Sequence, residues 1–378
     1  MKKFLKHIGI VLLALITIVV LTGSVFLNSS PQFGGQADEY RLTRYADSPN
    51  FENGKFVNDG PFNLEFDCHS IEKMIKDRFS SPPDVSPDRN IEVVKLDSLD
   101  IASYSDTLTR VTWFGHSTVL LEIDGKRLLF DPVFGQYVSP HPWLGEGRYQ
   151  EEMPIDIAQL PHIDAIFISH DHYDHLDYES IIGLREKTAR FFVPLGIGNH
   201  LAAWGIEWER IQEMDWWEES EFKELSIACT PSKHMSGRGL NDQFATLWSS
   251  WVVTGSNENI YFSGDGGYND RFKRIKDKYG PFDFAMLECG QYNTLWADVH
   301  MMPEETAQAG IDLGAEVVMP IHWGSFTLAT HSWTEPVERL TKEASKLDLT
   351  LSTPSIGESF LLDGKRPPQE YWWRAYSE

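Results

Sequence analysis

The run Ser169-His170-Asp171-His172-Tyr173-Asp174-His175 follows directly on the apolar stretch Ala165–Ile168 and decides what this chain can be. Side chains alternate along an extended segment, so His170, His172 and Asp174 can project to one side, with His175 turning away beside them. Neutral imidazole and carboxylate are ligands that suit zinc, with iron or manganese as lesser possibilities. The run therefore predicts a metal-binding loop at a strand exit; the alternative is a solvated loop that happens to be rich in His and Asp.

Composition narrows the class of protein further. The chain has 378 residues, of which 42% are hydrophobic and 24% charged, and this balance is typical of a globular protein with one large domain or two modest ones. Its formal charge of −23 repels a nucleic-acid backbone and anionic lipid, so we expect no nucleic-acid partner. The cysteines Cys68, Cys229 and Cys289 have no close-spaced pair, which favours buried apolar roles over a disulfide framework.

The N-terminus carries the second clear signal. Lys2, Lys3 and Lys6 precede an uncharged run from Ile8 to Leu27 that is long enough to cross a bilayer as a helix. The excess of positive charge before the run places the N-terminus in the cytoplasm and the body outside it. A cleaved signal peptide is the competing interpretation, but no Ala-x-Ala-like site follows. We expect an uncleaved, single-pass membrane anchor.

After the anchor the chain changes character twice. Residues 28–105 are rich in Pro, Asn, Gly and Asp, with one helical candidate near residues 69–79, and they are expected to wrap the body as an irregular extension. Strand-like apolar runs then occupy residues 111–114, 118–123, 127–130, 165–169, 189–194, 225–230, 249–254, 260–263, 284–288 and 317–321. Helical candidates lie at residues 178–187, 269–279, 303–313 and 333–345. This interleaving predicts a layered α/β body over residues 106–366, followed by a tail at 367–378.

Further metal-capable residues stand where predicted strands end. His234 follows the strand at 225–230, Asp265 follows the one at 260–263, and His322 follows directly on Ile321. Taken singly, each is typical of a structural residue, because a lone His is usually hydrogen-bonded and Asp-Gly is usually a turn. Together with the loop after Ile168 they predict one shared site, since α/β scaffolds commonly carry binding residues at strand exits.

The order His170-x-His172-x-Asp174-His175, then His234, Asp265 and His322, resembles the metallo-β-lactamase superfamily, whose fold is a four-layer αββα sandwich. The neighbourhoods are similar to N-acylphosphatidylethanolamine-hydrolysing phospholipase D and its bacterial relatives. The matching segments are residues 112–118, 131–134, 169–176, 231–234, 263–268, 300–305 and 321–326.

The resemblance implies two zinc ions and a role for each matching residue. The first zinc would be held by His170, His172 and His234, the second by Asp174, His175 and His322, and Asp265 would bridge them. His116 and Asp131 would orient ligands, and the alternative for both is plain turn structure after a strand. The implied catalytic residues are Asp174, Asp265, His300 and His331, the two histidines as proton donors to the leaving group. The alternatives are that His300 caps the helix at 303–313 and that His331 is a surface residue.

The function implied is a membrane-anchored di-zinc phosphodiesterase that cleaves a phospholipid headgroup by attack of a hydroxide shared between the cations. Its expected partners are the phospholipid substrate and the bilayer, with a homodimer as a further expectation. The same ligands would also serve a lactonase or lactamase acting on a carbonyl. A non-catalytic scaffold on the same fold is the third interpretation.

Overall fold

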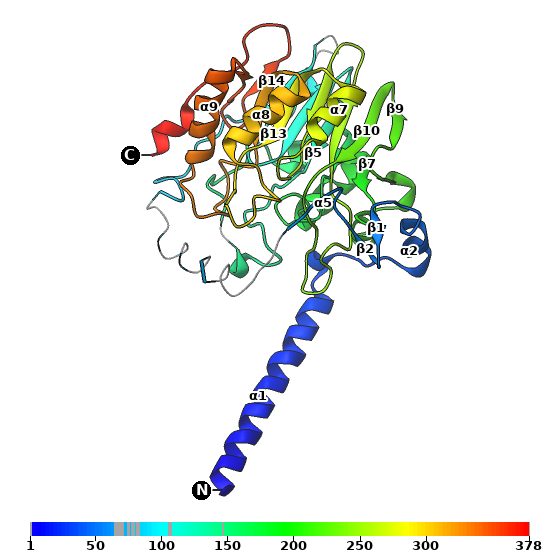
Figure 1. Cartoon of the computed structure of the whole chain (residues 1–378), viewed down its shortest axis with the longest axis vertical. Helices are drawn as coiled ribbons and strands as arrows, with labels where there is room; N and C mark the ends of the chain where they lie inside the picture. Colours follow the sequence, from blue (N-terminus) through cyan, green and yellow to red (C-terminus); the bar gives the residue numbers. More distant parts are fainter. Residues whose placement is uncertain are drawn as a thin grey trace.

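The computed structural model describes residues 2–63, 72–73, 76, 80, 84–104, 108–145 and 147–377. Two seven-stranded sheets pack face to face with helices on both outer faces, so the predicted four-layer α/β sandwich is confirmed (Figure 1). The helix predicted near residues 69–79 falls largely outside the described residues.

The first sheet has the strand order β16-β3-β4-β5-β6-β7-β8. Its strands are β16 (Ser359–Leu361), β3 (Arg110–Trp113), β4 (Val119–Ile123), β5 (Lys126–Phe130), β6 (Ile163–Phe167), β7 (Thr188–Pro194) and β8 (Ile211–Met214). From β16 to β5 neighbouring strands are antiparallel, and from β5 to β8 they are parallel. The β4–β5 hairpin turns through Asp124 and Gly125, both with positive φ, as a primed two-residue turn requires.

The second sheet has the order β15-β14-β13-β12-β11-β10-β9. Its strands are β15 (Thr350–Leu351), β14 (Ala315–Ile321), β13 (Phe282–Glu288), β12 (Asn259–Phe262), β11 (Ser249–Thr254), β10 (Leu225–Pro231) and β9 (Glu219–Phe222). Strands β12 to β15 run parallel. In both sheets, the loops that follow the carboxyl ends of the parallel strands are therefore available to form a binding site.

Helices cover the outer face of each sheet (Figure 1). The first sheet is covered by α4 (Ser98–Ala102), α5 (Tyr178–Leu184) and α6 (Gly198–Ala203), and the second by α7 (Arg271–Tyr279), α8 (Pro303–Leu313) and α9 (Glu335–Leu347). The helix predicted at 178–187 is correct as far as Leu184, after which it tightens into a 3₁₀ turn, Arg185–Lys187. The helix predicted at 333–345 begins later, at Glu335, and ends later, at Leu347.

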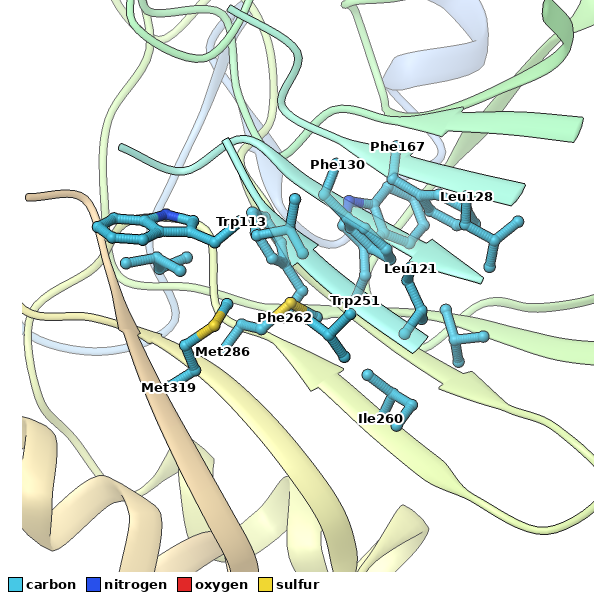
Figure 2. Packing of buried hydrophobic residues seen from close by; sticks show 14 of the residues in the cluster. Trp113, Leu121, Leu128, Phe130, Phe167, Trp251, Ile260, Phe262, Met286 and Met319 are labelled. Carbon is cyan, nitrogen blue, oxygen red and sulfur yellow. The ribbon is translucent and has the colours of Figure 1, made fainter. Parts of the chain in front are cut away.

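Aromatic and aliphatic side chains from both sheets fill the space between them (Figure 2). Phe130 and Phe167 from the first sheet stack with ring centroids 4.8 Å apart, and Phe262 from the second lies 4.9 Å from Phe130. Burying one such side chain stabilises the fold by about 1.5–3 kcal/mol. Cys229 and Cys289 are also fully buried, as predicted, whereas Cys68 lies outside the described residues.

The N-terminal helix α1 (Lys2–Ser29) projects from the body as a single rod (Figure 1). Its segment Lys6–Leu27 is long and apolar enough to cross a membrane, by length and composition. The chain then packs onto the body through the 3₁₀ turn η1 (Pro31–Phe33), α2 (Glu39–Tyr45) and the small hairpin β1 (Phe51–Glu52) and β2 (Lys55–Phe56).

The last residues also belong to the packed body. The 3₁₀ segment η6 (Trp372–Tyr376) places Trp373 in the core with no exposed surface. Trp372 stacks on Trp323, which stacks in turn on Trp113 of β3. The segment that the sequence marks as a tail is therefore a structural part of the sandwich.

Candidate metal centre

The histidine-rich loop leaves the carboxyl end of β6 and turns back on itself. The backbone N–H groups of His175 and Leu176 both donate to the carbonyl of His172, at 3.0 and 2.8 Å. The turn places His170 and His172 in one donor group and Asp174 and His175 in another. The expectation that His170, His172 and Asp174 share one side, with His175 turned away, is therefore wrong, because the backbone turns at His172 and is not extended. Helix α5 begins directly afterwards at Tyr178.

The first group of donors is three imidazoles. Nδ1 of His172 lies 3.0 Å from Nε2 of His170 and 3.2 Å from Nε2 of His234, which arrives from the end of β10. His234 donates its Nδ1–H to the Val299 carbonyl at 2.9 Å, and Nδ1 of His170 is 2.9 Å from the Ser169 hydroxyl. Because Nδ1 of His170 and Nδ1 of His234 are occupied by these contacts, Nε2 of each ring presents its lone pair to a shared point, as a cation site requires.

The second group combines a carboxylate with two imidazoles. Oδ2 of Asp174 lies 3.4 Å from Nε2 of His175 and 3.8 Å from Nδ1 of His322, which follows directly on β14. His175 donates its Nδ1–H to Oδ2 of Asp131 at 2.7 Å, which turns Nε2 toward the centre. Asp131, His175 and His322 are buried, and the side chain of Asp174 is 13% exposed.

Asp265 lies between the two groups. Its Oδ2 is 3.8 Å from Nε2 of His170 and 3.9 Å from Nε2 of His234, and its Oδ1 is 3.2 Å from Nδ1 of His322. Oδ1 of Asp265 and Nε2 of His175 are both buried and have no hydrogen-bond partner among the described residues. Such orphaned donor atoms at a point of convergence fit a bound cation, because a buried polar atom left unpaired is otherwise costly.

The electrostatics of the cluster agree with a cation site. Burial, reinforced by neighbouring imidazoles, holds the pKa values of His170, His234 and His322 well below the ordinary range, so these rings are neutral and able to bind metal. Burial raises the pKa of Asp265 to about 6. Burial lowers the pKa of His175, but Asp265 and Asp174 outweigh it and raise the pKa well above its usual value. Positive charge is therefore strongly favoured beside Asp265.

His116 and Asp131, which the sequence predicts as supporting groups, both contact predicted ligands, and His116 also belongs to the donor group of Asp174, His175 and His322. Asp131 accepts from the Ser169 amide at 2.7 Å and from the Ser169 hydroxyl at 2.6 Å, besides its bond to His175. Nε2 of His116 lies 2.9 Å from Oδ2 of Asp174. Burial lowers the pKa of His116 to about 4, so the ring is neutral and donates its Nε2–H to Asp174.

Three residues with strained backbone conformations lie at the donor cluster. Asp131, His116 and His322 have φ values of 37°, 51° and 66°, in the left-handed region that most side chains avoid. Each such residue costs about 1–3 kcal/mol and persists where the surrounding structure fixes it. Their clustering at one buried point is typical of a functional site.

The two predicted proton donors differ in position. His300 joins the donor cluster, with its Nδ1 4.0 Å from Oδ2 of Asp265 and its ring stacked on His322 at 5.1 Å. Its side chain is 14% exposed, so solvent reaches it. Among the described residues, His331 belongs to no donor group; it stacks on Tyr292 at 4.4 Å and its Nδ1 is 2.8 Å from the Ser332 carbonyl. Its catalytic role stays a prediction.

Sequence reasoning missed two supporting residues. Glu288 ends β13, is fully buried, and places Oε2 3.6 Å from Nδ1 of His300. Burial raises its pKa well above the ordinary range. Gly290 lets the backbone of His322 approach, since a Cβ there would lie 2.0 Å from the His322 carbonyl oxygen. The available signal was a carboxylate and a glycine at the end of a strand-like apolar run.

The comparisons agree with this architecture. The β-lactamase superfamily domain family matches residues 126–323, and the chain belongs to that superfamily. An uncharacterised protein of Mycobacterium tuberculosis is 41% identical over 333 residues, covering 86% of this chain and 88% of its own length. The N-acyl-phosphatidylethanolamine-hydrolyzing phospholipase D 1 of Caenorhabditis elegans is 36% identical over 250 residues, covering 63% and 70%.

Solved structures share the fold. Igni18, a metallo hydrolase from the archaeon Ignicoccus hospitalis, superposes with a TM-score of 0.51 at 23% identity, covering 68% of this chain and 98% of its own. The protein is thus a metal-dependent hydrolase of the metallo-β-lactamase superfamily, with relatives of the N-acylphosphatidylethanolamine phospholipase D type.

Proposed function

We propose that this protein is a membrane-anchored di-zinc phosphodiesterase that hydrolyses the headgroup phosphodiester of a phospholipid. The observation that carries the proposal is that the seven predicted His and Asp ligands, from four separate loops, form overlapping donor groups that also include His116 and His300. A relative at 36% identity bears the name of a phospholipase D acting on N-acyl-phosphatidylethanolamine, and this supports the substrate class.

The donor set divides naturally between two cations. His170, His172 and His234 would hold one, Asp174, His175 and His322 the other, and Asp265 lies where it could contact both. Bound zinc would supply an activated water near neutral pH and would offset charge on the phosphoryl oxygens. The same nitrogen and oxygen donors also accept iron or manganese.

The chain's own side chains would handle orientation and protons. Asp131 and His116 fix the ring of His175 and the carboxylate of Asp174 by hydrogen bonds at 2.7 and 2.9 Å. His300 is partly exposed at the edge of the cluster, beside Asp265. It is therefore placed to give a proton to the oxygen of the departing headgroup or lipid alcohol.

Helix α1 supports a lipid substrate because it would keep the catalytic body beside a bilayer. The lysines at its amino end, Lys2, Lys3 and Lys6, favour a cytoplasmic N-terminus and an extracytoplasmic body. An anchored enzyme needs no high affinity for its bilayer substrate, since tethering itself raises the local concentration.

The test is a substrate panel with the full chain in mild detergent or lipid nanodiscs. N-acylated and ordinary phosphatidylethanolamine, a nitrophenyl phosphodiester and a lactone would be compared after zinc loading, alongside elemental analysis for about two zinc ions per chain. Lipid and phosphodiester turnover is expected. Turnover of the lactone alone would refute the proposal and favour a carbonyl hydrolase, and no turnover with metal bound would favour a scaffold.

A matched pair of variants ties the activity to the site. His172→Ala is expected to abolish phosphodiester hydrolysis, because it removes one of three nitrogens from the first donor group. His162→Ala removes an exposed imidazole outside the cluster and is expected to leave hydrolysis unchanged. Full activity in His172→Ala would remove that residue from the site.

A further inference from the structure

An uncharged loop packs against the point where α1 meets the body. The ring of Phe26, in the last turns of α1, lies 4.9 Å from the ring of His141 and 5.9 Å from that of Trp143, both in the loop 132–145. The His141 and Trp143 rings themselves stack at 6.1 Å. Because Phe26 belongs to the apolar segment of α1, these loop residues lie at the level where that helix would leave a bilayer.

The same end of α1 is fixed to the support of the metal loop. Nε of Arg238 donates to the Gln32 carbonyl at 2.8 Å, and the other arm of the guanidinium donates to the carbonyls of Asp171 and Leu176 at 2.6 and 2.8 Å. Trp204 donates to the carbonyl of Pro31 at 2.7 Å. The exit of α1 and the histidine-rich loop are therefore held on one face of the molecule.

The contact between anchor and body is close and specific. The Gly35 amide donates to Nδ1 of His200 at 3.1 Å, and a Cβ on Gly34 would lie 2.1 Å from that same nitrogen. Gly34 also has a φ of 76°, which favours glycine. The anchor thus leaves the body through a docked segment whose position relative to the metal loop is set by packing.

Large apolar side chains on this face point away from the body. Trp143 is 72% exposed and Leu144 50%. Residues 8–37 and 132–145 contain no Asp, Glu, Lys or Arg, in a chain of net charge −23. An exposed apolar cluster without charge is a surface for an apolar partner, and Trp is a side chain that favours the membrane interface.

We propose that Trp143 and Leu144 form a second membrane contact, which enters the bilayer interface beside α1 and holds the metal-ligand edge against the lipid surface. This inference rests on the membrane-anchor part of the proposed function. The bilayer is the occupant that the structure favours, because the cluster continues directly from the apolar segment of α1 through Phe26. The alternative occupant is a second copy of the chain.

The first test measures depth in the membrane without using activity. Trp143→Cys in a Cys68→Ser background would be labelled with a nitrobenzoxadiazole fluorophore, since Cys229 and Cys289 are fully buried. The full chain would be placed in phosphatidylcholine vesicles with or without nitroxide-bearing lipid. Tyr371→Cys is the matched control, because Tyr371 is 48% exposed and lines the hollow beside Asp283 and Glu316, at the amino ends of β13 and β14.

Strong quenching at position 143 with little at 371 is the expected result. Equal quenching at the two positions overturns the proposal. Cross-linking of two chains through position 143 without quenching by the nitroxide lipid also overturns it, in favour of a dimer contact. This readout stands even if the protein hydrolyses no lipid, so it separates the inference from the proposed function.

The second test uses turnover. The double variant Trp143→Ser, Leu144→Ser is expected to lose about tenfold in hydrolysis of phospholipid in vesicles, since it removes two apolar side chains from the interface. Hydrolysis of a soluble nitrophenyl phosphodiester is expected to stay unchanged. A matched loss in both substrates overturns the proposal, as does an equal effect of Leu361→Ser, Tyr371→Ser at the opposite edge.

Discussion

At the residue scale, a polar contact at one ring nitrogen of a histidine orients the other nitrogen toward the metal centre. His170, His175 and His234 each occupy one ring nitrogen with Ser169, Asp131 or the Val299 carbonyl. Each of these contacts fixes the tautomer of the ring and directs the other nitrogen toward the metal centre, so no ring needs to reorient when a cation binds. The sequence showed the imidazoles but not these partners, apart from Asp131.

Asp131→Asn tests that arrangement. The amide would bond His175 more weakly and would leave Nε2 poorly aimed, so we expect affinity for the cation at Asp174, His175 and His322 to fall about 10–100-fold. Competition with a chelator of known affinity, followed by elemental analysis, measures this loss.

The matched control is Asp164→Asn. Asp164 is also a buried carboxylate near the first sheet, but it accepts from the Arg127 amide and pairs with Lys223, away from the cluster. The metal affinity of the Asp164→Asn variant is expected to equal that of the unchanged protein. Equal affinity in the two variants would show that the bond to His175 does not orient the ligand.

At the element scale, strand ends bring the donors together. The exits of β6 in the first sheet and of β10, β12 and β14 in the second all open on the same buried point. The apolar runs predicted the long central strands well. They missed the four edge strands of the two large sheets, β8, β9, β15 and β16, which are short. Strand β9 alternates Glu219 and Glu221 with partly buried residues and carries little apolar signal.

The C-terminal segment η6 is an element whose importance only packing shows. We expect Trp373→Ala to lower the free energy of unfolding by about 3–5 kcal/mol, because it empties a fully buried site beside Trp323. Urea unfolding of the detergent-solubilised chain, followed by circular dichroism, measures the change. Glu370→Ala, at an exposed position two residues before the same segment, is expected to shift the midpoint little. Similar midpoints for both variants would contradict the role assigned to this segment.

At the scale of the whole molecule, the centre joins the two sheets. Ligands from both layers must meet, so a cation that binds only the folded state stabilises the entire sandwich. We expect chelation to lower the melting temperature, by an amount equivalent to about 3 kcal/mol if metal had been present at about a hundred times its dissociation constant. Differential scanning fluorimetry with and without chelator, then with zinc restored, measures this.

The response should shrink in a variant that lacks one ligand of the first donor group. His172→Ala is expected to lose less melting temperature on chelation than the unchanged protein, because only the second group keeps all its ligands, whereas His162→Ala should respond as the unchanged protein does. A chelator effect of unchanged size in His172→Ala would place the stabilising cation somewhere other than this centre.

The donor residues, the layered α/β class and the apolar helix could all be predicted from the amino-acid sequence. These follow from local properties: strand runs, the residues at their exits and the length of an uncharged segment. Tertiary structure alone decided that His300 joins the donor cluster while His331 does not, that Glu288 lies behind His300, and that Trp373 closes the core. Which exits face one another depends on strand order across two sheets, and that is a property of packing between residues far apart in the chain.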